Sequence, residues 1–226
     1  MAELTAAMQK KWGEQAVRQG SLLHLSSLSP LSTSFHRLDA LLNGGIVPGE
    51  ITQYHGVETS GTTTLALKTI AQAQKKELRV IYIDPMNIFS PKYAADLGVN
   101  LEDLLLVRWA NEIEGIEIAT DMINRYGVGL VVFGHGGWIH QAGIPSSMRR
   151  LVNSLRRSSC AFISLNRCAL PHQSPFHPHA STQLQLKRLR WLERWGVVGG
   201  YLVRVNVVKY SGRDGHNGVT LRLDLP

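Results

Sequence analysis

The stretch 56-GVETSGTTT-64 decides the fold class, because it has the spacing of a phosphate-binding loop, or P-loop, written G-x-x-x-x-G-K-S/T. Gly56, Gly61 and Thr63 stand at their expected places, whereas Thr62 replaces the lysine that reaches the phosphates. The segment ITQYHG before the loop is typical of a strand, and TTTLALKTIAQAQKK after it is typical of a helix. Strand, glycine loop and helix therefore follow in the order that a P-loop requires.

On both sides of the loop, short apolar runs alternate with amphipathic segments. RVIYID, LLLVRW, LVVFG and AFISL are β-rich and almost entirely apolar, which is typical of parallel strands covered on both faces. FHRLDALL, EIEGIEIATDMINRYG and SSMRRLVNSLRRSS have helical periodicity. Near the end, VRVNVVKY and GVTLRLDL flank the turn-rich SGRDGHNG, as antiparallel strands do. We therefore predict an α/β fold with a mostly parallel, doubly wound sheet and an antiparallel C-terminal edge.

The chain divides into an arm and one core. Apolar residues recur every four positions in residues 1–20, which predicts a helical arm for docking or oligomerisation. The Ser- and Pro-rich residues 21–33 are typical of a linker. A length of 226 residues leaves room for one core, which we expect over residues 34–226, without a separate C-terminal domain.

The segment 168–186 has no periodicity and predicts a long loop. It contains His172, His177 and His179, but no Cys, Asp or Glu cluster completes a set of ligands, so we expect no metal site. The segment QLQLKRLRWLERW that overlaps its end is compatible with either a helix or a strand.

The composition is that of a soluble globular protein, with 44% hydrophobic and 18% charged residues. We expect no membrane span, because no apolar run is long enough. The N-terminus lacks the features of a signal peptide, and two cysteines are too few for a disulfide framework, so we expect a cytoplasmic protein. Most of the +7 net charge lies C-terminally, since residues 141–226 carry +10. Such a surface favours a polyanion or an acidic protein, although a solvated basic face remains an alternative.

With these motifs in view, the chain resembles the RecA family of recombinases. QKKWGEQAVRQGS is similar to the family's N-terminal oligomerisation segment, and LSTSFHRLDALLNGGIVPGEITQYHGVETSGTTTLALKTIAQAQ is similar to its P-loop core. RVIYIDPMNIFSPKYAADLGVNLEDLLLVRW resembles the segment that carries the family's I-D-A-E motif. The resemblance covers most of residues 8–140 and thins afterwards to AFISLNR and VRVNVVKY.

The departures fall on the positions that the resemblance makes catalytic. Thr62 takes the place of the P-loop lysine, Met86 that of the glutamate that activates water, and Gly134 that of the Walker B aspartate. We therefore expect a pseudo-ATPase with no cofactor. Asp84 or His135 could substitute, and a weak ATPase using Lys68 or Lys209 remains an alternative. Gly56 and Gly61 still permit a loop that points backbone N–H groups at an anion, so weak nucleotide or phosphate binding is also left open.

The resemblance implies partners as well. Among RecA-like proteins without a working ATPase, the chain is most similar to the ImuA type, accessories of the mutagenic ImuB polymerase-like protein in SOS-induced translesion synthesis. It implies contacts with RecA, for which we name Lys10, Trp12 and Lys209, and with an ImuB-type protein. Capping of a RecA filament is the expected activity in DNA damage repair and mutagenesis, and a mediator that loads filaments is the alternative. A nucleoid-associated cytoplasmic location follows from the same resemblance.

Single-stranded DNA is a further candidate partner. Four arginines share one face of a predicted helix, and a second basic set is interleaved with Trp191 and Trp195, a composition suited to backbone neutralisation and base stacking. The alternative is a set of solvated charges. The candidate DNA-contacting residues are Arg149, Arg150, Arg156, Arg157, Lys187, Arg188 and Arg190.

Overall fold

The computed structural model describes residues 29–108, 112–136, 144–167, 174–194, 196–210, 213–215 and 217–225. The expected arm, residues 1–20, lies outside the described residues, as do Lys10, Trp12, His172 and Trp195. Leu31 and Thr33, at the end of the expected linker, are buried, and Leu31 forms a β-bridge with Ile46. The core therefore begins slightly earlier than the composition suggests.

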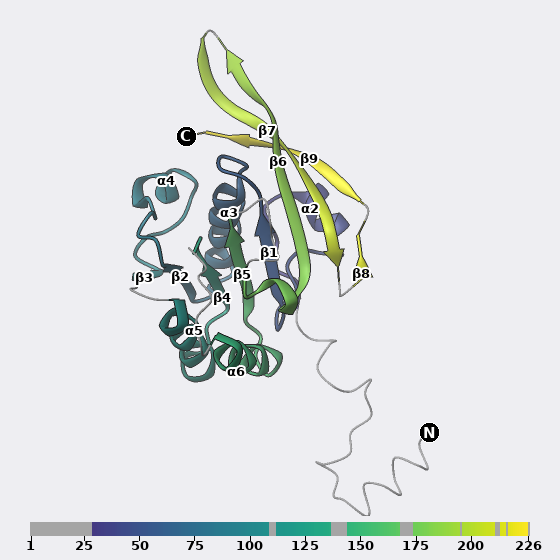
Figure 1. Cartoon of the computed structure of the whole chain (residues 1–226). Helices are drawn as coiled ribbons and strands as arrows, with labels where there is room; N and C mark the ends of the chain where they lie inside the picture. The colour runs from purple at the N-terminus through teal and green to yellow at the C-terminus, as the bar shows by residue number, and fades with distance from the viewer. Residues whose placement is uncertain are drawn as a thin grey trace, which may run out of the picture.

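The described residues form one mixed sheet with helices on both faces (Figure 1). Its strands lie in the order β3-β2-β4-β5-β1-β6-β7-β8, with β9 also paired to β7. The strands are β1 (Ile51–His55), β2 (Val80–Asp84), β3 (Leu104–Arg108), β4 (Leu130–Phe133), β5 (Ala161–Asn166), β6 (Ala180–Arg194), β7 (Val197–Tyr210), β8 (Arg213–Asp214) and β9 (Gly218–Asp224). The helices are α2 (His36–Leu41), α3 (Thr62–Lys75), α4 (Pro91–Asp96), α5 (Glu112–Tyr126), α6 (Ile144–Arg156) and the short 3-10 helix η3 (His177–His179).

The inner parallel strands are buried on both faces, whereas the edge strand β3, also expected to be covered on both faces, is only partly buried. Strands β1, β2, β4 and β5 are buried at every position. One hydrophobic cluster joins α3 to one face through residues such as Leu65 and Ile70. A second cluster joins α5 and α6 to the other face through residues such as Ile116 and Leu151. The predicted α/β class, the mostly parallel sheet and the antiparallel C-terminal edge are confirmed.

The prediction of a loop throughout residues 168–186 is wrong at its C-terminal end. Residues 180–186 open the long strand β6, which pairs in parallel with β1. The cause is the alternation in 182-TQLQL-186, where Leu184 and Leu186 enter the core while Gln185 remains exposed. Of the segment QLQLKRLRWLERW, which was compatible with a helix or a strand, residues 183–194 are part of strand β6. Strands β6 and β7 continue beyond the parallel strands as a projecting hairpin (Figure 1).

In the described part of the chain, no helix combines the length and the apolar character that crossing a membrane requires. Among the same residues, no three His, Cys, Asp or Glu side chains lie close enough together to hold a metal ion.

Candidate functional site

The P-loop connects β1 to α3 at the carboxyl ends of the parallel strands. A Cβ atom on Gly56 would meet the carbonyl oxygen of Leu186 at 2.4 Å, so only glycine fits there. Gly61 has φ of 96° and precedes the first residue of α3, and a Cβ there would meet a methyl group of Leu223 at 2.6 Å. Both glycines are therefore required for the loop to close between β1, β6 and β9.

The first turn of α3 consists of three threonines whose backbone N–H groups have no partner within the helix. The side chain of Thr62, at the lysine position, is buried. The Oγ1 atom of Thr64 lies 2.8 Å from the hydroxyl of Tyr93 and 2.9 Å from that of Tyr201. This hydroxyl cluster ties α3 to α4 and to the hairpin strand β7.

At the Walker B position, Gly134, the backbone of Ile83 and the side chain of Tyr82 leave little space for a side chain. Gly134 follows β4, and its N–H donates to the carbonyl oxygen of Ile83 at 2.7 Å. A Cβ atom on Gly134 would lie 2.9 Å from that oxygen and 3.3 Å from the hydroxyl of Tyr82. Tyr82 thus fills space that a longer side chain at position 134 would need.

Asp84, at the end of β2, supports a turn. Its carboxylate accepts the N–H groups of Ile88 and Phe89 at 3.1 and 2.8 Å, and the residue is buried. Met86, at the position of the water-activating glutamate, lies in that turn and is exposed. Asp84 therefore orders the turn that leads to α4, and Met86 offers no proton acceptor.

His135 lies two residues after the end of β4 and lines the pocket beside the P-loop. It is 2% exposed, and its Nε2 atom lies 3.2 Å from Oγ1 of Thr63. Burial lowers the pKa of His135 to about 4, and the positive charge of Arg167 contributes in the same direction. The imidazole is therefore neutral at pH 7. Its Nδ1 atom has no hydrogen-bond partner among the described residues.

The pocket around the loop has a volume of about 240 Å³ and is framed by aromatic rings and one guanidinium. Tyr93, Trp191 and Tyr201 contribute to its walls, and Arg167 projects from the end of β5. The Nη1 atom of Arg167 lies 3.6 Å from a carboxylate oxygen of Glu58 in the loop. The site can thus accept an anion, but it lacks the lysine that ordinarily supplies the positive charge.

These residues do not fit the magnesium ion that a P-loop site ordinarily holds, because Mg²⁺ prefers a shell of carboxylate, hydroxyl and water oxygens. The hydroxyl of Thr63 faces an imidazole nitrogen, Gly134 has no side chain, and the Asp84 carboxylate holds its own turn. The Thr63 hydroxyl is thus the one P-loop ligand that is kept, and it contacts His135.

The hairpin reaches the loop through Arg188. Its guanidinium donates to the carbonyl oxygen of Thr59 at 3.4 Å and to the hydroxyl of the same residue. It also lies over the ring of Trp191, 4.3 Å from the centroid, in a cation–π contact. Arg188 therefore contacts the P-loop from the sheet face opposite to that of Lys187 and Arg190.

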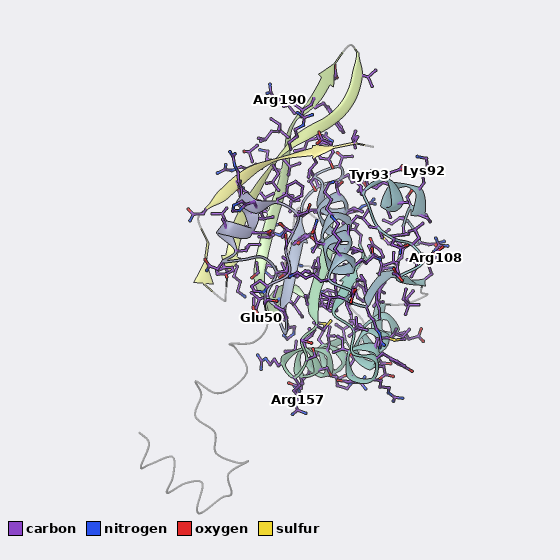
Figure 2. The ribbon with its side chains drawn as sticks, turned by 180° about the vertical axis from the view of Figure 1, so that it is seen from behind. Glu50, Lys92, Tyr93, Arg108, Arg157 and Arg190 are labelled. Atoms are coloured by element: carbon purple, nitrogen blue, oxygen red, sulfur yellow. The ribbon has the colours of Figure 1, made fainter. Side chains whose placement is uncertain are left out.

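The predicted DNA-contacting residues do not form one surface but lie in two separate groups, one at α6 and one on β6. The arginines of α6 and the basic residues of β6 lie at opposite ends of the molecule, as Arg157, directly after α6, and Arg190 show (Figure 2). Arg150 pairs with Glu117 of α5 at 2.5 Å, and Arg149, Arg156 and Arg157 are exposed.

Two of the predicted DNA-contacting residues of β6, Lys187 and Arg190, share one face of the sheet with basic residues of β7 and β9 that the sequence analysis did not name. Lys187 pairs with Arg204 of β7. Arg190 pairs with Leu202 of β7, and Leu202 pairs on its other side with Arg222 of β9. A register shift between Arg188 and Arg190 places Lys187 and Arg190 on this same face. The cross-strand register was the missing signal, since β6, β7 and β9 had to be aligned first. We call Lys187, Arg190, Arg204 and Arg222 the basic sheet face.

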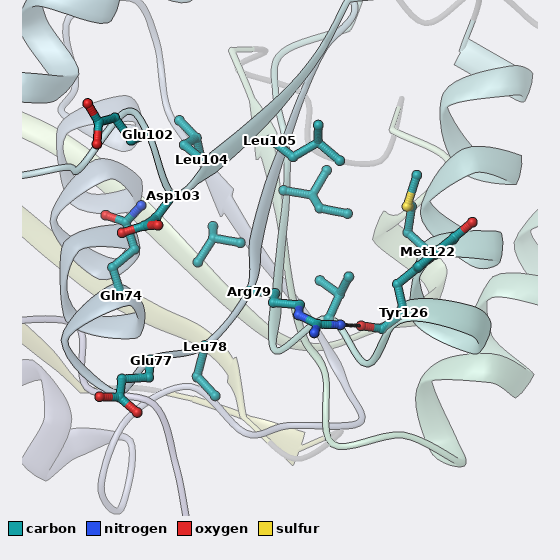
Figure 3. Close-up of a pocket in the computed structure, with 13 residues that line it drawn as sticks. Gln74, Glu77, Leu78, Arg79, Glu102, Asp103, Leu104, Leu105, Met122 and Tyr126 are labelled. Atoms are coloured by element: carbon teal, nitrogen blue, oxygen red, sulfur yellow. Dashed lines mark hydrogen bonds between the residues drawn. The ribbon is translucent and has the colours of Figure 1, made fainter.

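A second hollow lies along the edge of the sheet, beside β2 and β3, with a volume of about 710 Å³ (Figure 3). Its lining includes Leu105, which is 48% exposed, and Tyr126, whose carbonyl oxygen accepts a hydrogen bond from Arg79 at 2.6 Å. Strand β3 is the terminal strand of the described sheet, so one of its edges is unpaired within it. We call this hollow the edge groove.

Lys209, predicted to contact RecA, lies away from the loop. Its Nζ atom donates to the carbonyl oxygen of Ala180, 2.7 Å away, at the start of β6. The P-loop follows the other end of β1, since Ala180 pairs with Ile51 and Gln185 with His55. Lys209 therefore cannot reach the P-loop pocket within one molecule.

Comparison with known proteins agrees with this geometry. The model of the RecA N-terminal domain matches residues 1–149. RecA of Aquifex pyrophilus is 30% identical over 234 residues, which cover 90% of this chain and 67% of that protein. RecA of Leptospira biflexa is 30% identical over 233 residues, which cover 89% and 60%. The chain thus spans about two thirds or less of these relatives' length.

The fold has a matching solved structure. The crystal structure of the RadB recombinase superposes with a TM-score of 0.67 at 22% identity, covering 85% of this chain and 95% of RadB. The RadB structure shows a shared fold, and the match of the RecA N-terminal domain over residues 1–149, together with the 30% identity to RecA, shows the family. The chain belongs to the RecA family.

Proposed function

We propose that this chain is a RecA-family regulator that does not hydrolyse ATP and that acts on RecA filaments during the bacterial DNA damage response. The observation that carries the proposal is the loss of every charged catalytic group around a preserved loop. Thr62, Met86 and Gly134 stand at the three positions, and the backbone of Ile83 leaves little room for a side chain at position 134.

The remaining polar groups are poor substitutes. Hydrolysis needs a base near the attacking water and positive charge near the transferred phosphoryl group. Asp84 already accepts two backbone N–H groups, and a His135 with a pKa of about 4 is a weak base. Lys209 donates to Ala180 at the other end of the sheet. These contacts disfavour the weak-ATPase alternative, which predicts phosphate release that Thr62→Ala abolishes.

The filament-capping activity is supported by two unequal faces. The edge groove beside β3 offers apolar surface and an unpaired strand edge, which suits a contact with a neighbouring subunit. The P-loop face lacks the charges with which a nucleotide would join the next subunit. A heterologous interface propagates only when each unit presents both halves, so such a unit would end a filament.

The same proposal includes a second partner, an ImuB-type polymerase-like protein, and a role in translesion synthesis and mutagenesis. This part rests on the resemblance to ImuA-type proteins. Co-purification of the full chain with an ImuB-type protein, in the presence and absence of RecA, tests it directly. Failure to co-purify in both conditions would confine the proposal to RecA.

A filament-loading mediator that binds single-stranded DNA is the second candidate, and the basic sheet face favours it. Lys187 stands directly opposite Arg204, and like charges opposite one another destabilise a sheet. A bound polyanion would relieve that repulsion. Capping and mediation predict opposite effects on RecA.

The experiment that tests the proposal titrates the purified chain into RecA on single-stranded DNA. RecA's ATP hydrolysis, filament length and strand exchange are followed, and hydrolysis by the chain alone is measured separately. Capping predicts shorter filaments and slower hydrolysis, whereas mediation predicts faster strand exchange. Unchanged filaments and unchanged hydrolysis at equimolar amounts would sink both candidates.

A further inference from the structure

Strand β6 has an unpaired edge along its second half. It pairs with β1 only from Ala180 to Gln185, whereas it pairs with β7 as far as Arg194. On the side away from β7, no described strand accompanies residues 187–193, which continue into the projecting hairpin (Figure 1). Such an edge carries backbone N–H and C=O groups that can pair with another strand. We call residues 187–193, on that side, the open edge.

Exposed apolar side chains surround the open edge. Leu189 and Trp191 on β6 are 51% and 43% exposed. On the facing strand, Val198 is exposed, and Val197 is 68% exposed, the largest value for a large apolar side chain among the described residues. Strand β9 pairs with β7 no further than Gly200, so the end of the hairpin is two-stranded in the described part of the chain. Because a two-stranded hairpin without cover is marginally stable in water, this surface is suited to a partner.

The charge of the open edge indicates what kind of strand can pair with it. The edge contains Lys187, Arg188 and Arg190 but only one acidic residue, Glu193. Register shifts between Arg188 and Arg190 and between Leu192 and Glu193 interrupt its pairing with β7. Basic side chains and bulges are features that keep edge strands from pairing with other copies of the same protein. The whole chain also carries +7, so it repels a second copy and attracts an acidic strand.

The backbone groups and the apolar side chains favour a polypeptide over a nucleic acid. A nucleic acid would contact the basic side chains and leave the backbone groups of the edge unpaired. An extended polypeptide can pair with those groups, cover Leu189 and neutralise Lys187 and Arg190 at the same time.

We propose that the open edge of β6 binds an extended, acidic segment of a partner protein, which joins the sheet as an additional strand. The partner strand supplies the main-chain hydrogen bonds that β6 lacks beyond β1. The open edge is separate from the edge groove beside β3, at the other end of the sheet order. This inference therefore goes beyond the proposed function and requires no RecA.

Nuclear magnetic resonance of the full ¹⁵N-labelled chain with short synthetic peptides tests the proposal. The acidic probe alternates glutamate with valine. A second peptide has the same side chains but is N-methylated at its central residues, so it lacks backbone donors, and a third has lysine in place of glutamate. We expect the acidic probe to shift the amide signals of residues 187–193 saturably and to slow their hydrogen exchange. The other two peptides should bind at least roughly 10-fold more weakly.

Matched variants separate the edge from general charge and from folding. Leu189→Glu removes an apolar contact and adds a like charge, so it should weaken binding of the acidic probe by roughly 10-fold or more. Val208→Glu makes the same change in charge at an exposed position near the opposite end of β7 and should bind the probe as the parent does. The amide spectrum and a thermal melt confirm that each variant is folded.

Four results would overturn the inference. The first is the absence of saturable shifts with the acidic probe, and the second is equal binding of the N-methylated peptide, which would indicate charge attraction alone. The third is a dimer of the chain in sedimentation that Leu189→Glu dissociates, since the occupant would then be a second copy. The fourth is a shift of the same amides by oligothymidine but not by the acidic probe. None of these measurements involves RecA, so the proposed function stands or fails separately in the RecA titration.

Discussion

The Nε2 atom of His135 lies 3.2 Å from the Oγ1 atom of Thr63, and this contact joins the end of β4 to the first turn of α3. In a P-loop ATPase the corresponding hydroxyl faces magnesium. Here it faces a buried, neutral imidazole. The loop thus keeps its backbone shape, which its two crowded glycines require, while its metal-facing side is occupied by protein.

Restoring the aspartate at position 134 should destabilise the protein. In Gly134→Asp, the new Cβ atom would meet the carbonyl oxygen of Ile83 at 2.9 Å, and the carboxylate would crowd Tyr82. Overpacking of this kind costs about 1–3 kcal/mol, which urea unfolding measures. Gly199→Ala, where a Cβ meets nothing within 4 Å, is the control and should change stability by at most about 0.5 kcal/mol. Equal stability of Gly134→Asp and the parent would contradict the closed Walker B position.

Acid should weaken the fold through His135 and His55. Burial lowers the pKa of each to about 4 from 6.5, so the unfolded chain binds more protons between these pH values. Stability is therefore complete above pH 6.5 and falls as the pH drops toward 4. Well below pH 6.5, each histidine should contribute a loss of about 1.4 kcal/mol per pH unit.

Urea unfolding between pH 7 and pH 5 checks this prediction. His135→Asn should remove the contribution of one histidine and flatten the profile. An unaltered slope in His135→Asn would mean that the imidazole is protonated in the folded state.

The hydroxyl of Thr64 should stabilise the contact between the P-loop helix and the hairpin. Thr64→Val keeps the shape but leaves the hydroxyls of Tyr93 and Tyr201 without that partner. Leaving a buried polar group unsatisfied costs about 1–3 kcal/mol. Thr64→Ser keeps the hydroxyl and should recover most of the loss in thermal or urea unfolding. If Thr64→Val is as stable as the parent while Thr64→Ser is destabilised, packing of the methyl group and not the hydroxyl holds this contact.

The sequence predicted most of the sheet because β2, β4 and β5 are buried on both faces and are therefore mostly apolar. It missed the start of β6, where Gln183 and Gln185 alternate with leucines after a histidine- and proline-rich stretch. The P-loop glycines and Thr62 were visible from motif spacing, whereas Met86 and Gly134 were identified through the resemblance to the RecA family.

The surroundings of the loop were not predictable from local pattern. Arg167, Arg188 and Tyr82 come to the site from separate strands, and only the sheet order brings them together. The same holds for Arg204 and Arg222, whose place on the basic sheet face depends on cross-strand register. Contacts between side chains that are far apart in the sequence leave no periodic signal in the chain.

If the basic sheet face binds single-stranded DNA, Arg204→Gln should lower both the affinity and its salt dependence. Each phosphate that the protein no longer neutralises reduces the slope of log affinity against log salt by about 0.7. Fluorescence anisotropy with labelled oligothymidine over a series of salt concentrations measures both quantities. Arg149→Gln on α6 is the matched control and should have no effect, because that helix lies at the other end of the molecule (Figure 1). A larger effect of Arg149→Gln would assign DNA binding to α6 instead.

Leu105 should be a main contact of the edge groove with RecA. Its side chain is 48% exposed on the terminal strand β3, and burial of a leucine contributes about 1.5–3 kcal/mol. Leu105→Lys should therefore weaken binding to RecA by roughly 10- to 100-fold, measured by surface plasmon resonance without DNA. Val198→Lys makes a comparable change at a 39% exposed position on the hairpin and should bind RecA as the parent does. If both variants bind equally well, the edge groove is not the RecA contact, and capping must use another surface.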